Sequence, residues 1–150
     1  MLALTIEDTK KFMSSLLIEN LFDDYVLVHA QIKTSVTFEI DGRCNRAFFD
    51  TEELQAKNCE FEKWANIKPV VMNMIKGRRL PVRMHISLKA SGDDNISYGI
   101  NILYENASLK LVTNTTSSGF TLNRPDGSEW DRTVCGLLSD NAIPYVEMIN

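Results

Sequence analysis

The sequence predicts an α+β fold in which an antiparallel sheet of about five to seven strands buries its apolar face beneath helices. Apolar and polar residues alternate in several stretches, a pattern typical of sheets with one face in water. Other stretches carry apolar residues at helical spacing along one side only. With 150 residues, 44% of them apolar and 24% charged, the chain has the size and composition of one globular domain, which we expect to span residues 1–150.

The first and last helices are predicted from the residues at which they start. Asp8 or Thr9 can cap a helix that runs to about Asn20, because a side-chain oxygen there accepts a free backbone N–H. A short C-terminal helix begins at Ser128, where the spacing to Asp131 resembles a capping box. Both helices are expected to lie on the sheet through an apolar stripe, formed by Phe12, Met13, Leu16, Leu17 and Leu21 in the first and by Trp130, Val134, Leu137 and Leu138 in the last.

A second main helix is predicted from Cys59 to a C-cap at Gly77. Pro69 lies inside it. Because proline lacks a backbone N–H and clashes with the preceding turn, we expect a kink there, or two short helices of which the second starts near Lys68. The apolar stripe of this region comprises Phe61, Trp64, Ile67, Val71, Met74 and Ile75.

Residues 25–41 show the clearest strand pattern, with apolar side chains at the even positions, interrupted at Thr34, and mostly polar ones at the odd positions. A turn follows at residues 41–43. We expect the even positions to face the helices that carry Leu16 and Trp64, and His29 and Lys33 to face solvent. The buried sheet residues are then predicted to include Val26, Val28, Ile32, Phe38, Ile86 and Ile100.

The remaining strands are shorter and are predicted from alternation and turn residues. Glu105 and Asn106 form a natural hairpin tip between two of them. A strand near the C-terminus would have to lie at the edge of the sheet, because Pro144 cannot donate to a neighbouring strand. These strands are expected at residues 2–6, 82–89, 96–104, 109–111, 120–122 and 142–149.

Charge is distributed unevenly along the chain. The segment Lys63–Lys89, here called the basic segment, contains seven cations and no carboxylate, whereas the whole chain has a net charge of −4. One arginine side chain can donate hydrogen bonds to two phosphate or carboxylate oxygens at once. The cations at the centre of the basic segment are therefore a candidate anion-binding site for an acidic protein or a nucleic acid. These candidate residues are Lys76, Arg78, Arg79 and Arg83.

An alternative interpretation is a helix end with solvated charge, since cations offset the helix dipole there. The acidic residues of segments 50–62 and 93–94 would then balance the cations. The pI near 5.2 argues against a dedicated nucleic-acid binder, in which it often exceeds about 9.

Four further residues are candidate surface contacts. His29 and His85 fall on polar strand faces, where they could approach each other and join Glu39 in an acid–base site. Phe48 and Phe49 follow a turn outside any apolar stripe, so one ring is expected to be exposed as a contact point.

The sequence carries none of the common catalytic or phosphate-binding motifs, and we expect no cofactor and no metal site. Three widely spaced cysteines, Cys44, Cys59 and Cys135, are expected to be reduced thiols, because none forms a Cys-x-x-Cys pair. No signal peptide and no run of about 18 apolar residues is present, so a cytoplasmic location without membrane insertion is expected.

Three segments resemble a family of short proteins of unknown function from Gram-positive anaerobic bacteria. They are Thr9–Met13 with Leu16–Leu17, then Phe38–Arg43, and finally Ile75–Pro81. The resemblance implies a bacterial domain without an assigned activity, and it transfers no functional residue to this chain.

The expected order of elements is also similar to one domain of a DNA sliding clamp, an analogy of fold only. In such clamps the helices line a basic channel around DNA. That resemblance implies that Lys10, Lys11, Lys63 and Lys68 lie on the outward faces of the two main helices.

The function expected from the sequence is therefore a non-enzymatic binding or interaction module of the bacterial cytoplasm. One alternative is a clamp-like domain that contacts DNA through a basic helix face. Another is an enzyme of unfamiliar type that uses His29 or His85. The basic segment would recognise an acidic protein or a nucleic acid, and the chain could also form a homo-oligomer.

Overall fold

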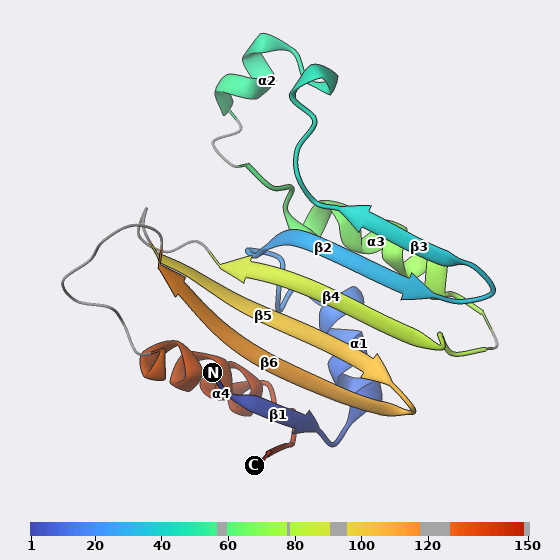
Figure 1. Cartoon of the computed structure of the whole chain (residues 1–150), viewed down its shortest axis with the longest axis vertical. Coiled ribbons are helices and arrows are strands. Elements are labelled where there is room, and N and C mark those ends of the chain that lie inside the picture. The colour runs from blue at the N-terminus through green and yellow to red at the C-terminus, as the bar shows by residue number, and fades with distance from the viewer. Residues whose placement is uncertain (57–59, 78, 91–95, 118–126, 149–150) are drawn as a thin grey trace.

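The computed structural model describes residues 1–56, 60–77, 79–90, 96–117 and 127–148. Within them, seven strands form one antiparallel sheet in the order β3-β2-β4-β5-β6-β1-β7, which confirms the α+β fold class (Figure 1). The strands are β1 (Ala3–Ile6), β2 (Val26–Lys33), β3 (Thr37–Asp41), β4 (Arg83–Ala90), β5 (Ile96–Glu105), β6 (Ser108–Ser117) and β7 (Tyr145–Glu147).

The helices of these residues are α1 (Thr9–Leu17), α2 (Thr51–Ala56), α3 (Trp64–Ile75) and α4 (Ser128–Asp140), with a 3-10 turn η1 at Arg46–Phe48. None of them is long and apolar enough to cross a membrane. Several residues used in the sequence predictions lie outside the described residues, namely Cys59, Arg78, Asp93, Asp94, Phe120 and Leu122.

The buried side chains form one cluster between the sheet and helices α1, α3 and α4. Ile32, Ile86 and Ile100 are fully buried in it, as predicted, together with Leu16 of α1 and Trp64 of α3. Phe38 is partly buried against the same cluster. The alternation of apolar residues therefore identified the buried face of most strands.

The prediction fails at the start of β2, where the pairing with β4 contains a β-bulge. Leu27 pairs with Leu88 and His29 pairs with Ser87, so Val28 is the extra residue. A bulge adds one residue to a strand and reverses the faces of the residues before it. Leu27 is consequently fully buried, and the two valines predicted for the core, Val26 and Val28, are only half-buried.

The meander of β4, β5 and β6 follows the sequence prediction. β5 and β6 are joined at Asn106 and Ala107, which both have positive φ, 54° and 59°. Two such residues form the tight turn that matches the twist of a hairpin. β7 pairs with β1 at the edge of the sheet, which confirms the expected edge strand in a shorter form.

The predicted start of α1 is confirmed, since Asp8 Oδ1 accepts the N–H of Lys11 at 3.0 Å. The C-terminal helix is not short, because α4 has 13 residues. Its N-cap is Gly127, so the predicted capping box at Ser128 is wrong. Asp131, the other residue of that motif, instead accepts a hydrogen bond from the buried hydroxyl of Thr113 at 2.5 Å.

The second main helix also differs from its prediction. α3 begins at Trp64 rather than at Cys59, because the preceding chain is extended and Phe61 forms a β-bridge with Arg43. α3 runs through Pro69 as one helix, so a division into two helices is wrong. Proline removes a single backbone donor from a helix whose apolar side is held by the core.

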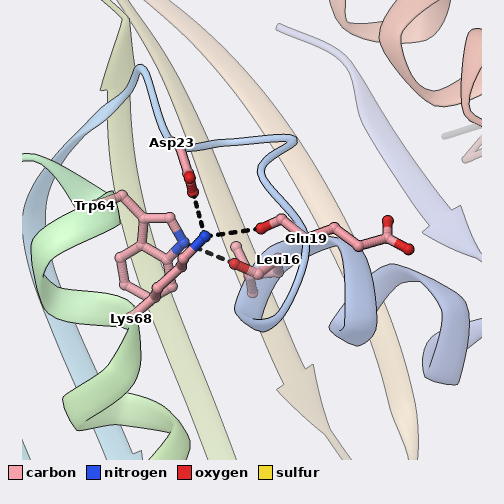
Figure 2. Close-up of polar contacts among 5 residues, drawn as sticks. All are labelled: Leu16, Glu19, Asp23, Trp64 and Lys68. Atoms are coloured by element: carbon pink, nitrogen blue, oxygen red, sulfur yellow. Dashed lines mark hydrogen bonds and ion pairs between the residues drawn. The ribbon is translucent and has the colours of Figure 1, made fainter.

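Side chains of α3 satisfy the backbone carbonyls at the end of α1 (Figure 2). Trp64 Nε1 donates to the carbonyl of Leu16 at 2.8 Å, and Lys68 Nζ donates to the carbonyl of Glu19 at 2.8 Å. Lys68 also pairs with Asp23 at 2.6 Å. The last carbonyls of a helix lack internal partners and carry partial negative charge, so an indole and an ammonium group stabilise this end of α1.

Tyr25 lies between Phe22 and Trp130, with ring centroids 5.7 and 6.2 Å away. Burial, and secondarily the charge of Asp24, raise the pKa of Tyr25 above its ordinary value of 10.0. The neutral Tyr25 side chain therefore stabilises the folded protein fully below pH 10.0. This stabilisation is lost as the pH rises through the pKa that Tyr25 has in the folded protein.

We expect the free energy of unfolding to fall above pH 10.0, and to fall less in Tyr25→Phe. Urea denaturation across a series of alkaline buffers measures the free energy of unfolding of the unmodified protein and of the variant. Equal alkaline losses in the two proteins would show that Tyr25 does not cause the effect.

Candidate binding site

The sheet has an open face that no helix of the described residues covers, because α1, α3 and α4 all pack on the opposite, apolar face (Figure 1). Side chains that alternate with the buried ones point to this open face. They are mostly polar and include His29, Gln31, Lys33, Arg83, His85, Ser87, Lys89, Asn101, Leu103, Glu105, Lys110 and Asn114.

A hollow of about 240 Å³ lies on the open face above the paired strands β4, β5 and β6. Gly99 forms part of its floor, and a Cβ atom at that position would meet the amide nitrogen of Asn114 at 2.8 Å. Any other residue at position 99 would therefore require the Asn114 side chain to move away from its present place beside Gly99. The other lining residues are Val28, Phe61, Ser87, Leu88, Lys89, Ser97 and Thr116.

Two cations flank Phe61 at the rim of the hollow. Lys89 Nζ lies 5.6 Å and the Arg43 guanidinium carbon 5.9 Å from the centroid of the Phe61 ring, distances typical of cation–π contacts. Arg43 also pairs with Glu60 at 3.7 Å. Lys89 has no carboxylate within 4.0 Å in the described part of the chain, so its ammonium is available to an anion in the hollow.

The predicted anion-binding residues lie at the end of α3, in the connection that follows it and at the start of β4. Arg83 lies on the open face, where it donates to Gln31 Oε1 at 2.6 Å and pairs with Glu105 at 3.8 Å. Lys76 is the C-cap residue of α3, and both Lys76 and Arg79 are exposed. Arg78 lies outside the described residues, so the convergence of the four cations on one patch stays a prediction.

The two histidines share the open face, as expected from the alternation. Gln31 pairs with His85 and His29 pairs with Ser87, so the histidines are diagonal neighbours on adjacent strands. His85 Nε2 contacts Asn101 Oδ1 at 3.2 Å, and Glu39 accepts from Gln31 at 3.0 Å rather than from a histidine. The described residues contain no cluster of potential metal ligands.

Phe48 and Phe49 belong to a projection that comprises η1 and α2, residues 44–56, here called the arm. The arm stands away from the sheet at the top of Figure 1. Phe48 is 84% exposed and contacts Phe49 edge to face, with 5.3 Å between ring centroids. One exposed ring was predicted, and Phe48 is that ring.

Residues 15–98 match a family described as a family of unknown function, DUF5721. The chain belongs to DUF5721. The DUF5721 match begins within α1 and ends in β5, so it includes the arm, Phe61 and Lys89. No curated protein and no solved structure matches the chain.

The hollow was missed by sequence reasoning although part of it lies in the DUF5721 segment. Phe61 was assigned to a helical stripe, and Lys89 was one of seven similar charges. The one usable signal was Gly99, because a single glycine at a polar-face position of an alternating strand marks a close approach of another group.

Proposed function

We propose that the protein is a non-enzymatic binding module of the bacterial cytoplasm that holds a carboxylate of an acidic partner protein in the hollow. A single observation supports this function. The Lys89 ammonium lies beside a polar hollow, where it contacts the Phe61 ring and has no carboxylate partner among the described residues. A carboxylate accepts charge-assisted hydrogen bonds from such a cation, and the Asn114 amide can donate another.

The composition of the hollow favours binding over catalysis. Its described lining residues include no histidine, cysteine or carboxylate, so they supply hydrogen-bond donors but no obvious general base. With a volume of about 240 Å³, the hollow is smaller than most sites for whole small molecules, which occupy about 300–1,000 Å³. It fits one functional group of a larger partner.

An acidic protein fits the open face better than a nucleic acid. Among the described lining residues of the hollow, Phe61 is the only aromatic one, and it contacts two cations rather than offering a free face to stack against bases. Elsewhere on this face the cation Arg83 is paired with Glu105, which also disfavours a continuous phosphate backbone.

Lys89→Gln is expected to weaken binding of a glutamate-rich peptide about tenfold, because a hydrogen bond to a charged group contributes about 1.5–3 kcal/mol and about 1.4 kcal/mol corresponds to a factor of ten. Lys110→Gln, on the same face, is the matched control and should change affinity less than about twofold. Calorimetric titration measures both affinities.

Equal losses in the two variants would show that only overall charge matters and would contradict the proposal. A single-stranded DNA oligonucleotide provides the comparison ligand. Tighter binding of DNA than of peptide, with the same dependence on Lys89, would favour a nucleic-acid partner instead.

A clamp-like contact with DNA is a second candidate, favoured by the packing of α1 beside α3 on one face. Lys10, Lys11 and Lys63 are exposed there. Lys68, however, does not point outward as that resemblance implied, since its side chain is 14% exposed and paired with Asp23. Binding of duplex DNA that is lost in Lys10→Glu with Lys11→Glu, but unchanged in Lys89→Gln, would favour this candidate.

A further inference from the structure

The arm presents an exposed aromatic ring among carboxylates. Phe48 is 84% exposed, and Asp50, Glu52 and Glu53 follow it, all of them exposed. Asp50 Oδ1 accepts the N–H of Glu53 at 2.7 Å, which fixes the start of α2 and the position of its acidic first turn. The arm has one exposed cation, Arg46, against these three carboxylates, so it offers a protruding apolar ring and a net negative charge.

A second exposed apolar surface has the opposite charge. We call it the basic end; it comprises Val36 in the turn between β2 and β3, and Lys76, Arg79, Leu80 and Val82 before β4. Leu80, Val82 and Val36 are 78%, 70% and 57% exposed. The N–H of Val82 donates to the carbonyl of Lys33 at 2.7 Å, which holds this segment beside the turn.

The two surfaces lie at opposite ends of the β2–β3 hairpin. At the arm end, Gly42 N–H donates to the carbonyl of Val28 at 3.0 Å, whereas Val82 pairs with Lys33 at the other end. Val28 and Lys33 are about 16 Å apart along the strand at about 3.3 Å per residue, and the arm extends further away. The arm of one molecule therefore does not reach its own basic end.

We propose that the arm of one copy docks on the basic end of a second copy. Phe48 would contact Leu80 and Val82, and the carboxylates of the first turn of α2 would face Lys76 and Arg79. Complementary charge and paired apolar groups within one chain favour a second copy over an unrelated partner. Because the two surfaces differ, the contact is head-to-tail and can be repeated from copy to copy.

The first test is sedimentation of the full chain over a range of protein and salt concentrations. Average mass should rise with protein concentration and fall with added salt, because salt screens exposed charges over about 8 Å at physiological ionic strength. A monomer at every concentration and at low salt would overturn the proposal.

The second test uses two variants that each retain one of the surfaces. Phe48→Ser with Glu52→Lys disables the arm, and Arg79→Glu with Leu80→Ser disables the basic end. Each variant alone should be monomeric, whereas an equimolar mixture should form a one-to-one dimer through the intact surfaces. Circular dichroism checks that both variants fold.

A mixture that stays monomeric, while the unmodified protein associates, would overturn the head-to-tail contact. Lys10→Glu with Lys11→Glu, a charge reversal on α1, is the control and should associate like the unmodified protein. Lys89→Gln should also associate normally, so this proposal can fail or succeed independently of peptide binding in the hollow.

Discussion

Trp64→Ala is expected to lower the free energy of unfolding by about 3–5 kcal/mol, the usual cost of removing a large buried aromatic side chain. Trp64 is fully buried, and its indole nitrogen donates to the carbonyl of Leu16 at 2.8 Å. The substitution therefore leaves a cavity between α1 and α3 and an unsatisfied carbonyl at the end of α1.

Urea denaturation monitored by circular dichroism measures this loss. Trp64→Phe separates its two causes, because phenylalanine fills most of the volume but cannot donate to Leu16. We expect an intermediate loss of about 1–3 kcal/mol for that variant. A loss below about 1 kcal/mol in Trp64→Ala would contradict the packing of α3 on α1 described above.

Gly42→Ala is expected to lower the free energy of unfolding by about 3 kcal/mol, at the upper end of the usual range for overpacking. A Cβ atom at this position would overlap the backbone carbonyl of Leu27. That carbonyl cannot move aside easily, because Leu27 lies in the bulged part of β2 and its N–H donates to Glu62.

Gly136→Ala in α4 is the matched control, since a Cβ atom there meets no other group within 4 Å. Alanine is favoured over glycine inside a helix by about 0.5–1 kcal/mol, so this variant should be slightly more stable than the unmodified protein. Denaturation curves of both variants provide the comparison. Near-equal stability of Gly42→Ala and the unmodified protein would show that the sheet end is not packed as described.

The sequence predicted the fold to the extent that local pattern determines it. Asp8 and the helical stripe located α1, and alternation identified Ile32, Ile86 and Ile100 as buried sheet residues. The bulge at Val28 was not predictable, because a bulge depends on pairing with β4, which is distant in the sequence.

Long-range contacts also explain the other differences between the elements predicted from the sequence and those in the structure. The chain before α3 forms a bridge between Arg43 and Phe61, so the apolar spacing around Phe61 imitated a helix that does not form. Lys68 was expected in solvent, but its partner Asp23 lies 45 residues away. Spacing along one segment carries no information about such partners.

The hollow was not predicted, because its residues come from separate elements. Phe61 precedes α3, Lys89 is in β4, Gly99 is in β5 and Asn114 is in β6. Their proximity follows from the register of β4, β5 and β6, in which Lys89 pairs with Gly99 and Gly99 pairs with Asn114. The prediction that either Phe48 or Phe49 is exposed needed no such register, and it was confirmed by Phe48.

An NMR titration can locate the surface that binds an acidic partner and show whether the hollow on the open face holds its carboxylate. A glutamate-rich peptide is added to isotope-labelled protein, and the shifts of the backbone amides are mapped on the structure. We expect the largest shifts at Lys89, Gly99 and Asn114, around the floor and rim of the hollow. Shifts concentrated on α1 and α3, or no saturable shift at all, would contradict this expectation.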